Sequence, residues 1–398
     1  MHGIQLLHEV LRKGCPEMHG RRLQALVAVV TGVLRGERLT LTDAGRELPG
    51  RAYEKHKVKR VDRLLRNWRL HGERQSVYRV LAERVVGRVR GWVPLVVDWT
   101  PGHAERFLML EAAVVLWGRA ITVYQEVHPV SAYKKPGVQR RFLRRLARIW
   151  PQGPQPVVIA DAGFQRAFFQ DLNRLGWYWL HRLTEPRCVR LLQDEQWQRV
   201  NDLHSAARHR PKALGRYVIG RENSYEARLC IVRASRKFRK DRPNDREHGH
   251  GTMARRYRKL YRGPWLLASN LPEAEFTAEN LVELYAQRMQ IEETFRDLKS
   301  HRFGYAMDYT RSRDPQRLQI LRLIGALAMY IQALVGLAAE GCSWTRHFQA
   351  NTERQRRVLS WGFLARRVLR NPQWTVSARE LRDVLRKLPH WTRYAPAT

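Results

Sequence analysis

Val93-Pro94-Leu95-Val96-Val97-Asp98 is an apolar run that ends in a carboxylate, and Pro156-Val157-Val158-Ile159-Ala160-Asp161 repeats the pattern. Short apolar runs of this kind are typical of strands buried on both faces of a sheet. Both runs are therefore predicted to be buried strands that stop at an aspartate. Two such strands, if they are neighbours, present Asp98 and Asp161 side by side at one edge of the sheet. A single aspartate at a strand end is weak evidence, because aspartates commonly form turns.

The segments around these runs predict the order of elements. Three strands, a helix, a strand, a helix and a strand follow one another, which is the order of an RNase H-like core whose first and fourth strands are adjacent and parallel. The fold class expected is therefore α/β. The intervening elements are predicted as strands at Phe107–Val115 and Ala120–Val127 with a turn at Gly118-Arg119, a helix at Val138–Ile149, a helix at Gln165–Arg174 and a strand at Gly176–Leu183.

The first 85 residues are predicted to be helical and strongly basic. Leu23–Leu34 forms one helix, Thr42 caps a second that Pro49-Gly50 ends, and Lys57–Asn67 forms a third. Short helices with a basic last member favour a helix-turn-helix DNA-binding module, whereas an ordinary three-helix bundle with a charged exterior is the alternative. The residues expected to contact DNA are Lys57, Lys59, Arg60, Arg63 and Arg66.

The remaining segments complete a five-part layout. Residues 186–264 are predicted to be a β-rich insertion with a basic loop at 233–262, in which His248 and His250 lie on a solvated turn. A strand returns at Trp265–Ala268, and Thr277 caps the helix that follows. The boundaries expected are 1–85 (helical, DNA-binding), 86–185 (core, first part), 186–264 (insertion), 265–342 (core, second part) and 343–398 (helical C-terminal region).

Charge restricts the class of partner. The 398 residues include 73 Lys and Arg against 37 Asp and Glu, so the formal net charge is +36. Positive charge spread along a whole chain favours binding to nucleic acid. The apolar stretch Leu323–Ala339 is short for a membrane span and contains Gln332, so we expect a buried core helix and no membrane partner.

The N-terminus and the cysteines indicate the compartment. The N-terminus has no secretory pattern, and the four cysteines are widely spaced without a C-x-x-C pair. A reducing cytoplasm is therefore expected.

A second constellation lies in the segment Leu281–Lys299. Tyr285, Arg288, Glu292 and Lys299 form a Y-x2-R-x3-E-x6-K series whose spacing places all four side chains on one face of a helix. Such a face can hold a metal ion against a phosphodiester. On an arbitrary helix it is more commonly a solvated surface with ion pairs.

Together the two constellations predict a metal site. Asp98, Asp161 and Glu292 supply only oxygen ligands, which suit Mg²⁺ or Mn²⁺ rather than zinc. Two such ions can activate an attacking oxygen and stabilise the leaving oxygen of a phosphodiester.

The chain resembles the bacterial insertion-sequence transposases of the Tn-ten and Tn-five type, most closely the Tn-ten branch. These are cut-and-paste enzymes with an Asp-Asp-Glu site. The likeness runs from the N-terminal helices to about residue 360 and is less clear over the basic loop and the last forty residues. It is carried by Lys59–Leu65, Val97–Trp99, Ala160–Phe164, Gly176–Leu180 and Arg288–Lys299.

The resemblance implies a role for each matching position. Asp98, Asp161 and Glu292 would bind two divalent ions, and Tyr285, Arg288 and Lys299 would grip phosphates beside the cut. Trp265 would stack on a base flipped from the duplex, although an ordinary core tryptophan is the alternative. Binding of terminal inverted repeats, a hairpin intermediate, joining to target DNA and a homodimer in the synaptic complex are likewise implied.

Two other functions remain open at this point. A non-catalytic repressor or inhibitor derived from a transposase would need only the basic helices. An RNase H-type nuclease would cut DNA but never join a 3′ end to a target. Retention of three carboxylates together with the phosphate-gripping series favours the transposase over both.

Overall fold

The chain folds into two compact units, each a mixture of helices and strands. The first comprises Met1–Gln155 and Met289–Tyr394, and the second comprises Pro156–Arg288 and Ala395–Thr398. The expected mixed α/β class is confirmed, whereas the predicted five-part layout stays a prediction. The computed structural model describes residues 1–102, 106–222, 224–233, 263–302, 304–350, 352–353 and 357–397.

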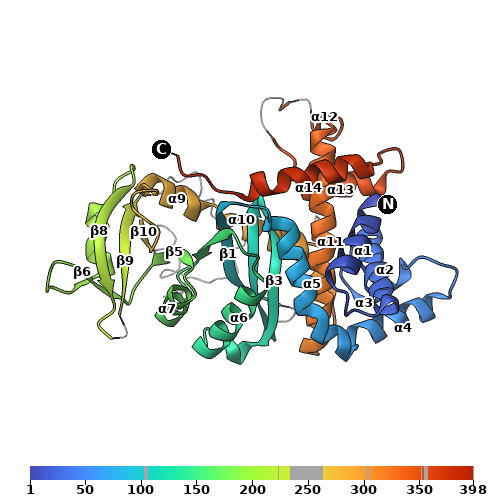
Figure 1. The fold of residues 1–398 in the computed structure, drawn as a ribbon, viewed down its shortest axis with the longest axis horizontal. Helices are drawn as coiled ribbons and strands as arrows, with labels where there is room; N and C mark the ends of the chain where they lie inside the picture. The colour runs from blue at the N-terminus through green and yellow to red at the C-terminus, as the bar shows by residue number, and fades with distance from the viewer. Residues whose placement is uncertain are drawn as a thin grey trace, which may run out of the picture. The chain divides into compact units, whose positions relative to one another are not determined.

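An antiparallel hairpin and a third strand form the sheet of the first unit. The strands are β1 (Gly91–Pro101), β2 (Phe107–Leu116) and β3 (Arg119–Pro129), in the order β3-β2-β1 (Figure 1). Trp117 and Gly118 connect β2 to β3 with φ values of 46° and 82°. Two successive positive φ values belong to the tight hairpin turn whose twist matches the strands. The prediction was therefore one residue late, because it placed the turn at Gly118-Arg119.

Strand β1 does not stop at Asp98, which corrects the sequence prediction. It continues to Pro101, and Asp98 pairs in register with Glu111 of β2. The strand pairing continues beyond the apolar run, with Trp99 opposite Leu110 and Thr100 opposite Met109.

The N-terminal segment of the first unit forms five helices, whereas three were predicted, at Leu23–Leu34, after Thr42 and at Lys57–Asn67. One predicted cap also differs. Thr40 rather than Thr42 caps the short third helix, since its Oγ1 accepts the Asp43 N–H at 3.1 Å. The period of α4 (Glu54–Leu65) predicts an inward face of Val58, Val61, Leu64 and Leu65; the last three are buried and Val58 is half-buried. The helices are α1 (His2–Gly14), α2 (Gly20–Gly36), α3 (Leu41–Arg46), α4 (Glu54–Leu65) and α5 (Trp68–Val86).

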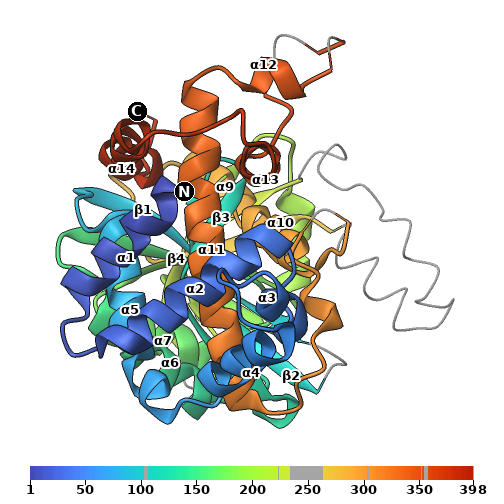
Figure 2. The same cartoon turned by 90° about the vertical axis from the view of Figure 1, so that its right-hand side faces the viewer.

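A long apolar helix, α11 (Pro315–Gly341), is the core of the first unit. It is long and apolar enough to cross a membrane, yet its apolar window is wholly buried inside the unit, so the prediction of a core helix is confirmed. Figure 2 shows α11 beside α2, with which it packs. The other helices of this unit are α6 (Pro136–Ile149), α10 (Met289–Lys299), α12 (Thr345–Phe348), α13 (Trp361–Arg370) and α14 (Ala378–Thr392).

The second unit has a mixed sheet with strand order β4-β5-β10-β9-β8-β6-β7. Strands β4 and β5 are parallel, with α7 between them in sequence, which is a βαβ connection. Strands β6, β7, β8 and β9 fall within residues 186–264, while the division of that segment as a β-rich insertion stays a prediction. Most of the basic loop, with His248 and His250, lies outside the described residues. The bounds are β4 (Pro154–Ala160), α7 (Arg166–Arg174), β5 (Tyr178–Leu183), β6 (Cys188–Leu191), β7 (Gln198–Arg199), β8 (Lys212–Ile219), β9 (Tyr225–Val232), β10 (Trp265–Ser269) and α9 (Ala278–Ala286).

The Y-x2-R-x3-E-x6-K series does not lie on one continuous helix, which corrects a further expectation. Thr277 does cap α9, but the helix ends at Ala286. Gln287 and Arg288 form a turn, and α10 starts at Met289. Tyr285 is therefore on one helix, Arg288 in the turn, and Glu292 and Lys299 on the next helix.

Candidate active site

Asp98 is held at the middle of a paired strand in the first unit. The backbone N–H of Trp99 donates to Asp98 Oδ1 at 2.8 Å, and the side chain is half-buried. Residues directly opposite on antiparallel strands project from the same face of the sheet. Asp98 thus shares its face with Glu111, which is 1% exposed.

Helix α10 is fixed to the start of β3 by polar contacts along one of its faces. Gln290 Oε1 accepts the Gly118 N–H at 3.0 Å, and Thr294 Oγ1 accepts the Ala120 N–H at 2.7 Å. One turn further on, the Arg119 guanidinium bonds Asp297 at 2.6 Å. These contacts fix the rotation of α10 about its axis, and with it the direction of the side chains on the opposite face.

Glu292 and Lys299 lie on the opposite face of α10. They are seven residues apart, so they project in nearly the same direction, about 10 Å apart along the axis. Glu292 lies in the first turn of α10, where the helix dipole favours a negative charge. The side chain is half-buried.

Lys299 connects α10 to the strand that carries Asp98. Its Nζ donates to Thr100 Oγ1 at 2.7 Å. Burial lowers the pKa of Lys299, and the charges of Asp308, Glu111 and Asp98 act in the opposite direction. The structure therefore brings Lys299 into the electrostatic neighbourhood of Asp98.

A buried polar network that the sequence analysis missed lies beside these residues. The Arg322 guanidinium of α11 forms an ion pair with Glu111 and donates through Nε to Gln125 Oε1 at 2.7 Å. Gln125 in turn donates to the Tyr78 hydroxyl at 2.8 Å. The sequence did contain a signal for this network, since Glu111 and Arg322 are single charged residues within the apolar runs of β2 and α11. A buried charge needs a partner, so each of them indicates an ion pair in the core.

Asp161 stands directly after β4 in the second unit. Its Oδ1 accepts the Gly163 N–H at 2.7 Å, and the side chain is half-buried. A Cβ on Gly163 would lie 2.9 Å from that same oxygen, so only glycine keeps the contact at this distance. The turn Asp161-Ala162-Gly163 therefore holds the carboxylate by a local backbone bond.

Tyr285, Arg288, Trp265 and Asp161 come together within the second unit. Burial raises the pKa of Tyr285; Arg288, which is hydrogen-bonded to it, acts in the opposite direction, and Asp161 is close enough to add to the rise. The rings of Trp265 and Tyr285 meet edge to face with centroids 5.1 Å apart. Trp265 is half-buried at the start of β10, so part of this residue remains accessible.

Three carboxylates form the donor set predicted for a metal. Asp98 and Glu292 belong to the first unit and Asp161 to the second. Within the residues that the structure describes, no three His, Cys, Asp or Glu side chains form a group able to hold a metal ion. The three carboxylates are half-buried and offer only oxygen atoms, which are the ligands that Mg²⁺ and Mn²⁺ prefer. Binding of one metal site by all three stays a prediction.

The basic residues predicted to contact DNA lie on α4 and at its C-cap. Lys59, Arg60, Arg63 and Arg66 are exposed, and Lys57 is half-buried. Two aromatic side chains that the sequence analysis did not consider flank the helix. They are Tyr53, 76% exposed, and Trp68, 75% exposed.

Comparison with known proteins gives one finding. The model of a protein family described as a transposase DDE domain matches residues 96–329. A comparison with curated proteins gives no match. The matched segment starts two residues before Asp98 and includes Asp161, Glu292 and Lys299.

Proposed function

Because the chain belongs to the transposase DDE domain family and is thus a transposase, we propose that it moves an insertion sequence by cut-and-paste transposition. The matched segment supports this most directly, since it contains all three predicted carboxylates. Enzymes of this family cut and join phosphodiesters with divalent metal ions. The arrangement of Lys299 beside the strand of Asp98 agrees with such chemistry.

Asp98, Asp161 and Glu292 would hold two Mg²⁺ or Mn²⁺ ions. When bound, such ions activate an attacking oxygen and stabilise the leaving oxygen at phosphorus. The protein supplies the remaining groups. Lys299 and Arg288 offer positive charge to the phosphates that flank the cut.

Trp265 is proposed to stack on a base flipped out of the duplex. Stacking of a base on an aromatic side chain contributes ~1–3 kcal/mol. Its edge-to-face contact with Tyr285 holds the indole in place before DNA arrives. Unpairing the base relaxes the tight bend of a hairpin end.

The reaction we propose has four displacements at phosphorus. Water first nicks one strand and frees a 3′-hydroxyl. That hydroxyl attacks the opposite strand and forms a hairpin end, and a second water opens the hairpin. The same 3′-hydroxyl then attacks a target strand, and the bond to the target's own 3′ oxygen breaks.

The assembly we propose is a homodimer that holds two terminal inverted repeats and the target DNA. We propose that it works on the nucleoid in the bacterial cytoplasm and is related to the transposases of the Tn-ten type. The net charge of +36 supports a polyanionic partner.

An excision assay tests the proposal. Supercoiled plasmid carrying the ends of the chain's own element is incubated with protein, with and without Mg²⁺. We expect nicked plasmid, hairpin-ended fragments whose two strands stay joined in a denaturing alkaline gel, and products joined to target DNA. A protein that binds the ends but never cuts them, or one that cuts but never joins, would refute the proposal in favour of a binder or a nuclease.

Two substitutions on α10 make the test specific. Glu292→Gln should abolish cleavage while binding to end DNA persists. Glu293→Gln is the matched control, since Glu293 is the adjacent carboxylate and pairs with Arg296 and Arg119. Equal loss of cleavage in both variants, or parallel loss of cleavage and binding in Glu292→Gln, would remove Glu292 from the site.

A further inference from the structure

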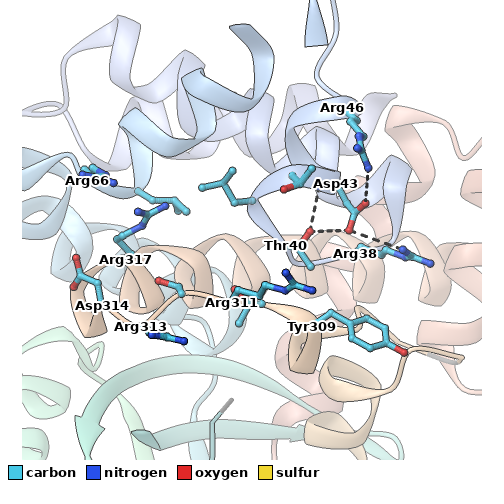
Figure 3. A pocket seen from close by; sticks show the side chains of 15 residues that line it. Arg38, Thr40, Asp43, Arg46, Arg66, Tyr309, Arg311, Arg313, Asp314 and Arg317 are labelled. Carbon is cyan, nitrogen blue, oxygen red and sulfur yellow. Dashed lines mark hydrogen bonds and ion pairs between the residues drawn. The ribbon is translucent and has the colours of Figure 1, made fainter. Parts of the chain in front are cut away.

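A basic pocket of about 950 Å³ lies in the first unit, apart from the residues assigned above to catalysis. One wall comes from the entry to α3 and from the end of α4. The other comes from residues 309–314 and the start of α11. Figure 3 shows Arg38, Arg46 and Arg66 on the first wall and Arg311 and Arg313 on the second.

The pocket carries an excess of positive charge. Six arginines and two aspartates line it. Asp43 accepts a bond from the Thr40 hydroxyl at 2.7 Å and lies 4.0 and 3.8 Å from the guanidinium groups of Arg38 and Arg46. Asp314 caps α11 by accepting the Gln316 N–H at 2.8 Å.

Arg311 and Arg313 carry positive charges that no carboxylate of the described residues neutralises, so these charges can attract a ligand. Both are exposed, and neither has a carboxylate partner among the residues that the structure describes. Ser312 lies between them, and its buried Oγ has no hydrogen-bond partner there. Buried polar atoms are normally satisfied, so this hydroxyl indicates a missing acceptor or donor.

Arg317, at the start of α11 in the second wall, also has a buried polar atom without a hydrogen-bond partner among the described residues. Its Nη2 bonds Asp62 of α4 at 2.5 Å, but its buried Nε has no partner within the described part of the chain. A guanidinium commonly offers two parallel N–H groups to one anion. An oxyanion such as a phosphate could accept hydrogen bonds from the Ser312 hydroxyl and from Arg317 Nε. The excess of arginines in the pocket favours the negative charge of such a ligand.

We propose that this pocket binds a backbone phosphate of duplex DNA and so connects the basic helix α4 to the segment that follows α10. The inference rests on the proposed function, since DNA is the substrate there. Arg66 belongs both to the pocket and to the predicted DNA-binding face of α4, so one duplex can contact both. Phosphate contacts of this kind position the protein on the duplex without reading its sequence.

A binding assay tests the pocket independently of cleavage. The affinity of a short fluorescent duplex, taken from the end of the element, is measured in EDTA over a range of salt concentrations. The double variant Arg311→Gln/Arg313→Gln should bind at least ~10-fold more weakly. The slope of log affinity against log salt should fall by about one for each phosphate that the variant no longer neutralises.

The matched control removes the same charge elsewhere in the first unit. Arg379→Gln/Arg382→Gln alters two exposed arginines of α14 and should change neither affinity nor slope beyond twofold. Arg311→Lys/Arg313→Lys should recover most of the affinity, since the charge is kept. Thermal unfolding of each variant checks that the fold is retained.

The outcomes separate this inference from the proposed function. Equal weakening of both glutamine variants would overturn the pocket, because only total charge would then matter. Unchanged DNA affinity with loss of self-association would overturn it in favour of a protein contact. Neither result depends on whether the wild-type chain cuts and joins DNA, which the excision assay decides.

Discussion

Asp98 and Asp161 are each held by a neighbouring backbone amide. The Trp99 N–H bonds one, and the Gly163 N–H bonds the other, at 2.8 and 2.7 Å. Each bond fixes the position of one carboxylate oxygen. At the scale of residues, both aspartates are thus oriented by a few atoms of their own strand or turn.

Lys299 should govern the alkaline limit of cleavage. Its pKa is lowered by burial, so its positive charge is lost at a lower pH than that of an ordinary lysine. The rate of nicking should therefore fall as the pH rises through that lowered pKa. Lys299→Arg should keep most activity and extend the active range upward, because arginine stays charged.

Removal of the charge gives the complementary result. Lys299→Gln should slow nicking by roughly 100-fold, the usual loss when one charge-stabilising donor at phosphorus is deleted. Rates measured on the plasmid substrate across the pH range check both variants. An alkaline limb that Lys299→Arg leaves in place would show that another group sets it.

Glu126 should make stability depend on pH in the acid range. Burial opposes ionisation of this carboxylate, but hydrogen bonds from His128, Tyr124 and Arg145 prevail and lower its pKa to about 2. A lowered pKa stabilises the fold above the unfolded value near 4.5 and loses that contribution as the pH falls toward 2. The contribution is at most about 3 kcal/mol.

Urea unfolding at several pH values measures this contribution. Wild type should lose stability between about pH 4.5 and 2, and Glu126→Gln should lose markedly less over that interval. The control Glu9→Gln removes an exposed carboxylate of α1 and should follow wild type. Parallel curves for wild type and Glu126→Gln would contradict the assignment.

At the scale of elements, the sequence predicted most helices and strands but not where some of them end. The spacing of apolar residues predicts α2, α6 and α11, because in each helix the apolar residues are the ones that become buried. The break at Gln287-Arg288 is invisible to spacing, since the turn keeps helical steps on either side of it. Strand β1 outlasts its apolar run because its pairing with β2 continues through Pro101.

The contact between α11 and α13 depends on the absence of a side chain at Gly336. A Cβ there would lie 2.0 Å from the carbonyl oxygen of Trp361, which cannot move without its helix. Gly336→Ala should destabilise the chain by at least ~1–3 kcal/mol, the range for an overpacked core. Gly72→Ala is the matched control within helix α5.

The control is expected to change stability in the opposite direction. A Cβ on Gly72 meets no atom within 4 Å, so alanine adds helix propensity without a clash. Gly72→Ala should therefore stabilise by about 0.4–1 kcal/mol. Midpoints of urea unfolding measure both, and a stabilising Gly336→Ala would show that α13 does not approach α11 this closely.

At the scale of the whole molecule, composition predicted the class of partner but not its binding places. The net charge of +36 is a sum and carries no position. The pocket of Arg311 and Arg313 depends on residues more than 200 positions apart, which only the fold brings together. The family match likewise spans segments of both compact units, so neither unit alone contains all three predicted carboxylates.

The same charge should give thermal stability a salt dependence whose sign reverses when DNA is present. Without DNA, like charges repel in the compact state, and added salt screens them, so the Tm should rise with salt. With excess duplex DNA, the Tm should be highest at low salt, because binding to the folded state adds stability in proportion to the logarithm of affinity. That affinity falls steeply as salt rises.

Differential scanning of the chain with and without a duplex of unrelated sequence measures both trends. The two curves should converge at high salt, where binding is lost and only screening remains. A neutral polymer of similar length in place of DNA should leave the salt dependence as in free protein. A Tm that rises with salt equally in both conditions would mean that the positive charge is compensated within the protein itself and does not serve to hold a polyanion.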